Sequence, residues 1–418
     1  MHGRQLGRRR FLKEGAAIAG LTAGAIRSAS GQGQTLGSAT AEARPKDSRA
    51  YGERSRFLNS VRTLDRTGQV TPLQDLMGII TPSALHFVQS RGYDPPDIDP
   101  RQHRLLIHGM VDRPLVFTLE ELKRFPSVSR ILYLECPGNT GKTALEDGAA
   151  TVQQTHGKTS CSEWTGVPVS LLLQEAGVQA GAYWLVAEGA EKGNRAQSVP
   201  LEKAMDDALV AYGQNGEPLR PEQGFPIRLL LPGCTGGVNT KWLRRIKVLE
   251  QPELGIWDLQ QGNAIRVSPD GKGGRLPTMP PKSVITFPSG GQRLPGRGFY
   301  EITGLAWSGR GAIQRVEVST DGGQTWKDAQ LQDPVLPMAH TRFRFPWNWN
   351  GEEAVIQSRC TDEQGEVQPT LAELSQRRGI RPGSLQSDWV ADSYARLGLN
   401  AVQPWKVTRE GSVSNAMF

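Results

Sequence analysis

The sequence predicts an α+β domain followed by a β-sandwich, and three observations lead to this prediction. Between residues 100 and 250, strand and helix patterns are mixed without the steady alternation of a doubly wound sheet. Residues 251–282 are rich in glycine, proline and glutamine, which is typical of a linker. From residue 283 onward the apolar period changes to two. The 418 residues are enough for two domains, each with its own core.

The first domain, residues 75–250, is expected to combine short helices with short strands. Thr118 and Glu121 form a capping box, which predicts a helix start. Gly177 is placed to end a second helix in VPVSLLLQEAG. A third helix is expected from Ser198 and Pro200, and the predicted strands are two around a turn in 103–117, then 131–134, 183–186, 209–212 and 227–231.

The second domain, residues 283–418, is expected to be a sandwich with a C-terminal extension. Asp321, Gly322 and Gly323 supply the residues that a hairpin turn with positive φ angles needs. The extension has a polar helical pattern and ends with a strand pattern in AVQPWKV. Four stretches with alternating apolar residues predict the strands of the sandwich: 299–307, 312–326, 341–350 and 352–360.

The first 43 residues have the features of an export signal. The order Arg-Arg-Arg-Phe-Leu-Lys at 8–13 fits the twin-arginine pattern, and a mildly apolar stretch follows it. Cleavage is expected between residues 30 and 43, after Ser30 or Ala43, and the alternative is an ordinary secretory signal. Proteins exported already folded usually carry a cofactor, so we expect a cofactor and a periplasmic location.

The net charge of +7 does not indicate a nucleic-acid partner. The first thirty residues hold six basic residues and one acidic residue, so they account for five of the seven charges. Basic residues interleaved with aromatic ones, which nucleic-acid binding favours, are not found elsewhere. After the signal, apolar runs stay shorter than the 18 residues of a membrane span.

Four cysteines bear on the chemistry: Cys136, Cys161, Cys234 and Cys360. Without a C-x-x-C pair, zinc or iron–sulfur sites held by cysteines alone are not expected, and neither is covalent c-type haem. Two disulfides are one reading of this number, and buried thiols are another. Cys136 differs because it ends an apolar strand and precedes Pro-Gly-Asn, where a soft thiolate ligand can be presented to a redox metal.

The segment ECPGNTGK, residues 135–142, resembles the E/Q-C-x-G-N segment of the sulfite oxidase family of molybdopterin enzymes. STDGGQTW, residues 319–326, is similar to the start of that family's Ig-like dimerisation domain. Residues 123–139 and 150–168 resemble most the molybdenum subunit of the sulfane dehydrogenases in Sox thiosulfate oxidation. The resemblance covers about 75–370, through 87–92, 107–122, 162–173, 198–206, 209–233 and 239–248.

The resemblance implies roles for single residues. Cys136 corresponds to the metal ligand, and Tyr212 corresponds to a catalytic tyrosine near the metal. Gln89, Ser90 and Arg91 stand where relatives have Arg-Asn-His, and Lys142 stands where some relatives have arginines, so contacts there differ from the family pattern. The residues implied to hold the pterin are Phe87, Val88, Gln89, Ser90, Arg91, Cys136, Gln223, Arg228, Asn239, Thr240 and Lys241.

The resemblance also implies an activity, namely oxidation of a reduced sulfur atom with oxygen derived from water. Molybdopterin with molybdenum would be the cofactor, and electrons would leave to a separate c-type cytochrome because this chain has no haem motif. The expected substrate is sulfane sulfur on a carrier protein, and the expected assembly is a homodimer through the sandwich. The alternatives are a free sulfite dehydrogenase, a periplasmic sulfoxide reductase and an exported binding protein without a cofactor.

Overall fold

A computed structural model describes residues 55–65, 68–89, 94–141, 147–192, 196–255, 258, 265–380 and 399–417. The chain divides into Met1–Leu58 and a compact unit, Asn59–Phe418. The predicted export signal, Ser90, Arg91, Lys142 and residues 381–398 of the C-terminal extension lie outside the described residues. Within them, no helix is both long and apolar enough to cross a bilayer.

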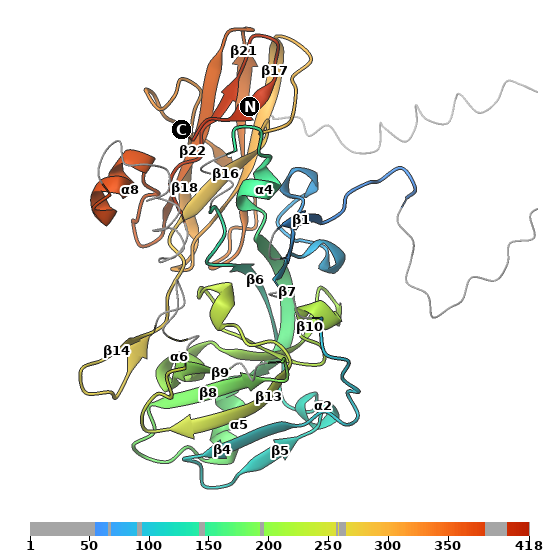
Figure 1. Cartoon of the computed structure of the whole chain (residues 1–418), viewed down its shortest axis with the longest axis vertical. Helices are drawn as coiled ribbons and strands as arrows, with labels where there is room; N and C mark the ends of the chain where they lie inside the picture. Colours follow the sequence, from blue (N-terminus) through green and yellow to red (C-terminus); the bar gives the residue numbers. More distant parts are fainter. Residues whose placement is uncertain are drawn as a thin grey trace, which may run out of the picture. The chain divides into compact units, whose positions relative to one another are not determined.

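The first domain contains two five-stranded sheets, drawn in cyan to yellow-green in Figure 1. One sheet has the order β5-β4-β13-β8-β9, and all its pairings are antiparallel except that of β4 with β13. Its strands are β4 (Leu105–Gly109), β5 (Leu115–Phe117), β8 (Trp184–Gly189), β9 (Ala196–Pro200) and β13 (Leu243–Leu249). The mixture of pairings confirms the predicted α+β class.

The other sheet has the order β11-β10-β7-β6, with β12 also paired to β10. Its antiparallel strands are β6 (Val128–Glu135), β7 (Thr159–Pro168), β10 (Leu209–Gln214), β11 (Glu217–Pro218) and β12 (Arg228–Leu230). A small sheet of β1 (Thr63–Asp65), β2 (Gly68–Val70) and β3 (Val88–Gln89) precedes it. This second large sheet is the one that presents Cys136.

Helices of the first domain are short. α2 (Leu119–Leu122) has the predicted capping box, and α5 (Val169–Ala176) ends at Gly177 in the left-handed conformation. α6 begins only at Leu201, because Ser198 lies in β9 and its backbone donates to Asp258. The other helical elements are η1 (Leu73–Asp75), η2 (Ser83–Leu85), α4 (Val152–His156), α6 (Leu201–Asp206), η3 (Pro221–Gln223) and η4 (Gly236–Val238).

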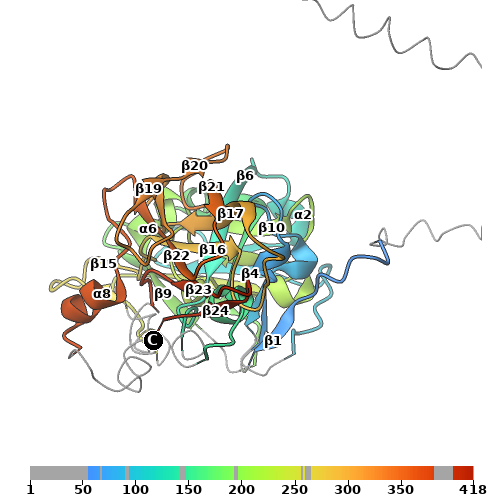
Figure 2. The same cartoon turned by 90° about the horizontal axis from the view of Figure 1, so that it is seen from above.

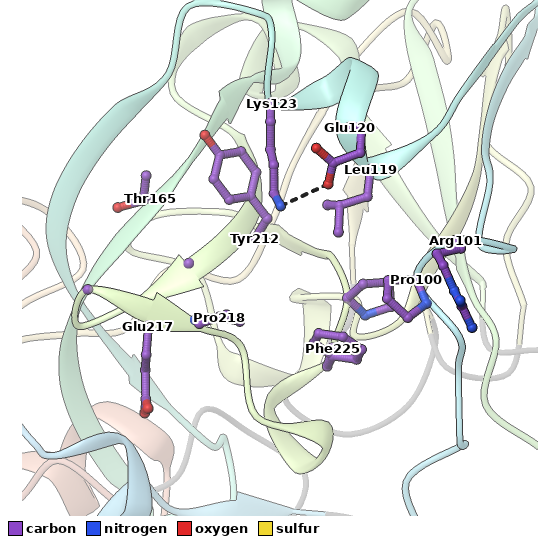
Figure 3. A pocket seen from close by; sticks show the side chains of 13 residues that line it. Pro100, Arg101, Leu119, Glu120, Lys123, Thr165, Tyr212, Glu217, Pro218 and Phe225 are labelled. Atoms are coloured by element: carbon purple, nitrogen blue, oxygen red, sulfur yellow. Dashed lines mark hydrogen bonds and ion pairs between the residues drawn. The ribbon is translucent and has the colours of Figure 1, made fainter. Parts of the chain in front are cut away.

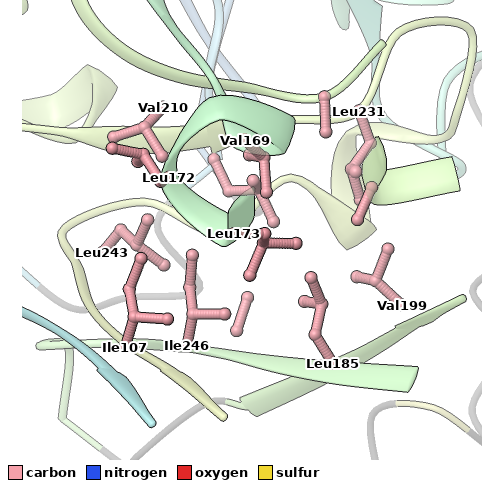
Figure 4. Packing of buried hydrophobic residues seen from close by; sticks show 14 of the residues in the cluster. Ile107, Val169, Leu172, Leu173, Leu185, Val199, Val210, Leu231, Leu243 and Ile246 are labelled. Atoms are coloured by element: carbon pink, nitrogen blue, oxygen red, sulfur yellow. The ribbon is translucent and has the colours of Figure 1, made fainter. Parts of the chain in front are cut away.

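The main core of this domain lies around α5. Val169, Leu172 and Leu173 are fully buried and point from α5 towards the sheet that contains Ile107 and Ile246 (Figure 4). Apolar residues at positions 1, 4 and 5 of this helix give one continuous buried face. The packing explains why so short a helix is stable, since tertiary contacts rather than length supply its stability.

The second domain is a sandwich of two antiparallel sheets, seen from above in Figure 2. One sheet contains β16 (Lys282–Phe287), β17 (Gly298–Trp307), β21 (Thr341–Trp349) and β20 (Gln330–Leu331). The other contains β19 (Lys327–Asp328), β18 (Ile313–Ser319), β22 (Ala354–Asp362), β23 (Trp405–Val407) and β24 (Val413–Asn415). The four predicted alternating stretches and the strand in AVQPWKV are therefore confirmed.

The structure also describes the predicted hairpin turn, most of the segment 251–282 and the polar helix of the extension. Gly322 and Gly323 adopt positive φ angles of 75° and 89°, as the hairpin prediction required. The segment 251–282 contains a small hairpin, β14 (Arg266–Val267) with β15 (Gly274–Arg275), and its last residue already begins β16. The polar helix of the extension is α8 (Leu371–Arg378), which starts with its own capping box.

Candidate active site

Cys136 lies directly after β6, on a loop that the backbone fixes at both ends. Its amide donates to the Lys158 carbonyl at 3.0 Å, and the Asn139 amide donates to its carbonyl at 2.9 Å. The Asn139 side chain accepts the Lys158 amide at 3.0 Å. Cys136 is half-buried, whereas Gly138 leaves the space beside its sulfur open, because a Cβ there would approach Sγ only to 3.9 Å. A bulky group can therefore reach this thiol.

A second segment, residues 235–239, packs against the same loop. A Cβ at Gly236 would lie 3.0 Å from the Glu135 carbonyl oxygen, so a side chain there would crowd the backbone that precedes Cys136. Asn239 shapes the turn, since its side chain accepts the Leu231 amide at 2.7 Å and donates to the Thr235 carbonyl at 2.8 Å. The turn is therefore held by a side chain as well as by η4.

A cluster of cations forms elsewhere on the same sheet, where β12 begins. Arg228 is buried, and its Nη1 donates to the Gln223 carbonyl at 3.0 Å. Gln223 donates to the Phe87 carbonyl at 2.9 Å, and Lys241 donates to the carbonyls of Gln89 and Glu222 at 3.3 and 3.0 Å. Residues from three separate stretches of the chain are thus joined in one hydrogen-bonded group.

Burial makes this cation cluster unfavourable without an anion. Burial lowers the pKa of Arg228 from 12.5 to about 9. Burial, together with the charges of Arg228, Arg62 and Lys241, lowers the pKa of His86 to about 3. Arg228 Nε and His86 Nε2 are buried atoms without a hydrogen-bond partner. An unsatisfied guanidinium donor such as Arg228 Nε is rare in a finished fold, and it indicates an anionic ligand.

Cys136 and Arg228 lie at two ends of one sheet face. Ala211 pairs with Arg228 and with Gly166, and Gly166 pairs with Val128, which is eight residues before Cys136. At about 3.3 Å per residue, the two backbones are separated by more than 20 Å along the strands. Long side chains and an elongated ligand would bridge this separation.

The face between them is lined by Trp164 and a small apolar cluster. Trp164 is fully buried and donates from Nε1 to the Leu132 carbonyl at 3.2 Å. The Arg228 guanidinium lies 5.1 Å from its ring centroid. The same cluster contains Phe87, Leu132, Leu134, Trp164, Leu209, Ala211, Leu219 and Leu230, with Cys136 packed against it.

The structure separates Tyr212 from Cys136. Tyr212 sits in a bulge opposite Gly166 and Thr165, at the far end of β6 from Cys136. Its ring packs with the main core of the domain instead of the cluster around Trp164. A tyrosine side chain is too short to cover the roughly 20 Å of strand between them. The predicted place of Tyr212 beside the metal ligand is therefore not reproduced.

Tyr212 instead lines a pocket of roughly 440 Å³ (Figure 3). In Figure 3 its ring faces Lys123 of the α2 region, whose ammonium pairs with Glu120 at 3.1 Å. Figure 3 also labels Leu119, Thr165, Glu217, Pro218 and Phe225 among the residues that line the pocket. This pocket is mainly apolar, and the Lys123–Glu120 ion pair on its wall is exposed.

Most of the other predicted cofactor residues come together. Phe87, Gln89, Gln223, Arg228 and Lys241 share the hydrogen bonds given above. Val88 is buried beside them in β3, and the Thr240 carbonyl accepts the Leu229 amide at 2.8 Å. Asn239 shapes the turn near Cys136, while Ser90 and Arg91 lie outside the described residues.

Sequence reasoning missed two members of the cluster, the cation Arg62 and the neutral imidazole of His86. Arg62 donates to the His86 carbonyl at 3.3 Å and pairs with Glu222 at 3.1 Å. His86 directly precedes Phe87, so a basic residue next to the predicted pterin segment was the available signal. Arg62 lies in a polar stretch with no motif, so only the tertiary fold identifies it.

The other three cysteines are buried thiols. Burial raises the pKa of Cys161 to about 12 and that of Cys234 to about 11, and it also raises the pKa of Cys360. No disulfide joins any of the four cysteines, all of which are described. Protonated and shielded thiols are poor ligands, which leaves Cys136 as the accessible one.

The donor set fits a cofactor that brings most of its own ligands. Among the described residues, no group of three or more His, Cys, Asp or Glu side chains could hold a metal ion. One accessible thiol lies at one end of the face, and the buried cation Arg228, with an unpaired Nε donor, lies at the other. A metal with dithiolene sulfurs, linked to a phosphate, needs one soft protein ligand and distant cationic donors.

Comparisons with known proteins agree with this arrangement. The family described as "Oxidoreductase molybdopterin binding domain" matches residues 92–257, and the family "Mo-co oxidoreductase dimerisation domain" matches residues 276–381. The structure is similar to that of the sulfane dehydrogenase SoxCD from Paracoccus pantotrophus. The TM-score is 0.74 and the identity 35%, over 92% of this chain and 99% of that chain.

Curated relatives include plant nitrate reductases. Nitrate reductase [NADH] 2 of Phaseolus vulgaris is 35% identical over 70% of this chain and 36% of its own length. Nitrate reductase [NADH] 1 of Arabidopsis thaliana is 35% identical over 66% of this chain and 34% of its own length. The chain therefore spans about a third of the length of these relatives.

Proposed function

Because the chain belongs to the sulfite oxidase family of molybdopterin oxidoreductases, we propose that it oxidises sulfane sulfur bound to a carrier protein. Its cofactor is molybdopterin with molybdenum. We propose that electrons then pass to a separate c-type cytochrome. The observation that carries this proposal is the single accessible thiol, Cys136, and the distant buried cation cluster on one sheet face.

The residues of the chain have separate tasks in this scheme. Cys136 would supply the soft protein ligand, and the loop hydrogen bonds hold its backbone in place. Arg228 and Lys241 would bind the phosphate end, because Arg228 has an unpaired buried Nε and both carry fixed charge. Gln223 would orient Arg228 through its carbonyl. When bound, the cofactor supplies two-electron redox chemistry with oxygen derived from water.

The substrate proposal depends on the SoxCD relative. That protein is named a sulfane dehydrogenase, and this chain covers 99% of its matched chain. Free sulfite is the second candidate substrate. Near the ligand cysteine, this chain has Lys142 where some relatives have arginines. A sulfoxide reductase is disfavoured, because such enzymes generally lack the Ig-like domain present in this chain.

Partners and location complete the proposal. The domain at 276–381 belongs to a dimerisation family, which supports a homodimer. The twin-arginine pattern at 8–13 supports export of the folded protein to the periplasm. A separate cytochrome is supported by the lack of any C-x-x-C-H haem motif in the sequence.

Metal analysis and electron paramagnetic resonance (EPR) test the assignment. Protein made in a host that synthesises the cofactor should contain about one molybdenum per chain, with a Mo(V) spectrum that Cys136→Ser alters or removes. Cys234→Ala is the matched control, because it removes a buried thiol from the neighbouring turn and should leave the spectrum unchanged. Protein without molybdenum, or an unchanged spectrum in Cys136→Ser, would refute the assignment.

Substrate assays separate the two sulfur sources. Sulfane sulfur on a carrier protein and free sulfite are offered in turn, with cytochrome c reduction as the measurement. Turnover that is at least ten times more efficient with the carrier supports the proposal. Efficient turnover of sulfite alone would identify a sulfite dehydrogenase instead.

A further inference from the structure

We infer that the sandwich domain positions the loop of Cys136, with Lys282 and Trp307 as the positioning residues. Five residues form what we name the Glu135 network: Glu135, Asn139, Thr140, Lys282 and Trp307. The inference deepens the proposed function and rests on it in one respect, since it assumes that Cys136 binds the metal. The predicted pterin residues do not include any member of this network.

Glu135 is the last residue of β6 and directly precedes Cys136. Its side chain is 0% exposed, as is that of Lys282, and the two form an ion pair at 2.6 Å. The indole Nε1 of Trp307 donates to the second carboxylate oxygen at 2.7 Å. Both oxygens of Glu135 are therefore bound by side chains from the sandwich.

These two sandwich residues are neighbours across the sheet. Lys282 is the first residue of β16, Trp307 is the last residue of β17, and the two are paired in register. Opposed residues in antiparallel strands have side chains about 5 Å apart, so both can reach one carboxylate. The sandwich thus offers one pre-aligned pair of donors to the end of β6.

The network continues into the loop on the far side of Cys136. The Asn139 side chain donates at 2.9 Å to the Glu135 oxygen that pairs with Lys282. The Lys282 ammonium also lies 3.4 Å from the Thr140 hydroxyl. Thr140 has a φ angle of 56°, which is unusual for a residue with a branched Cβ. Contacts therefore fix Glu135, which precedes Cys136, and also Asn139 and Thr140, which follow it in the loop. Displacing Lys282 or Glu135 would release both sides of the ligand loop.

A role in positioning explains this network better than stability alone. Removing two charges from water is expensive, so a buried ion pair stabilises a fold no better than a well-packed apolar pair of similar volume. The directional bonds of a carboxylate, an ammonium and an indole do fix a geometry, which apolar contacts do not. A loop that presents a metal ligand needs such a fixed geometry.

The test compares three variants in one domain. Lys282→Met removes the ammonium, and Trp307→Phe removes only the indole donor and is the milder change. Arg342→Met is the matched control, because Arg342 is also a buried cation of the sandwich but donates to the carbonyls of Leu76 and Gly78, away from the loop. Unfolding temperature is measured for all three.

Two readouts report on the loop. In cofactor-free protein, the rate of Cys136 alkylation measures its exposure, and the other three cysteines are buried and react slowly. In loaded protein, the Mo(V) EPR spectrum measures the geometry at the metal. We expect Lys282→Met to raise the alkylation rate at least fivefold and to shift the spectrum, and Trp307→Phe to do the same to a smaller extent.

The control decides between positioning and simple destabilisation. Arg342→Met should lower the unfolding temperature, but its alkylation rate and its spectrum should equal those of the wild type. If Arg342→Met changes both loop readouts as much as the network variants do, the inference is refuted. The inference is also refuted if Lys282→Met folds and both network variants have the alkylation rate and the spectrum of the wild type. If Lys282→Met does not fold, wild-type readouts in Trp307→Phe alone refute the inference.

Failure of the proposed function gives a different pattern. In that case wild-type protein lacks molybdenum, or Cys136→Ser leaves the spectrum unchanged. The alkylation rates of cofactor-free protein then still show whether the sandwich holds the loop.

Discussion

Replacement of Arg228 by methionine should have opposite effects on the empty and the loaded protein. In the empty protein Arg228 is a buried cation whose Nε has no partner. Methionine has a similar length, fills the same space and brings no charge. We therefore expect the cofactor-free Arg228→Met protein to be more stable than the wild type, and its affinity for the cofactor to be lower.

The magnitude follows from the burial of Arg228. A pKa lowered from 12.5 to about 9 corresponds to a burial cost of at most roughly 5 kcal/mol. The hydrogen bond to the Gln223 carbonyl and the contact with the Trp164 ring offset about 3 kcal/mol of it. The net gain on removing the charge is then about 1–2 kcal/mol. Loss of one charge-assisted phosphate bond, about 2–3 kcal/mol, should weaken cofactor binding roughly 30- to 150-fold.

Urea unfolding of protein made without cofactor synthesis measures the first effect, and pterin content after dialysis measures the second. Arg342→Met serves as the control, because Arg342 donates to the carbonyls of Gly78 and Leu76 at 2.7 and 3.0 Å. Its loss should destabilise the protein by about 1–3 kcal/mol, since two buried carbonyls lose their partner. If Arg228→Met destabilises the empty protein as much as Arg342→Met does, Arg228 is a structural residue and the phosphate-site reasoning fails.

Three further predictions concern other residues. Burial holds the pKa values of His86 and His340 at about 3. As the pH falls through 6.5, the unfolded chain therefore binds more protons than the folded chain. The free energy of unfolding should fall by roughly 1 kcal/mol per histidine between pH 7 and 5.5. Urea unfolding at both pH values measures this, and a flat profile would contradict neutral burial. Lys241→Met should lower pterin content about tenfold, with unchanged circular dichroism. Tyr212→Phe should keep the Mo(V) spectrum and turnover within about twofold, whereas a hundredfold loss would place Tyr212 beside Cys136 after all.

Local patterns in the sequence predict the fold class and most strands. Gly177 ends α5 and Thr118 caps α2 as expected, because caps depend on neighbouring residues only. Ser198 shows where this reasoning fails. Its Pro-Leu-Glu neighbours favour a helix, yet Ser198 belongs to β9, where it pairs with Val186 of β8 and its amide donates to Asp258, sixty residues away. Tertiary contacts of this range have no local signal.

In the candidate site, too, some residues could be predicted from the sequence and others depend on tertiary contacts. Arg228 and Lys241 lie in a long stretch that resembles a known family, so they could be assigned from sequence. Lys282 could not, because it lies at the end of a predicted linker and its partner Glu135 is 147 positions earlier. Tyr212 was assigned by its motif, but a bulge and the strand register place it away from Cys136. Register between distant strands is set by packing, which a motif does not encode.

The two ends of the site depend on different parts of the fold, and this separates two kinds of defect. Arg228, Lys241 and Gln223 all belong to the first domain, so changes there should reduce how much cofactor is retained without altering the metal that remains. Glu135 is bound by the sandwich through Lys282, so changes there should alter the metal environment while the phosphate end still holds the cofactor. Because the backbones of Cys136 and Arg228 are more than 20 Å apart, these effects should be nearly additive in a double variant. Strong coupling between Arg228→Met and Trp307→Phe in cofactor content would show that one binding step controls both ends.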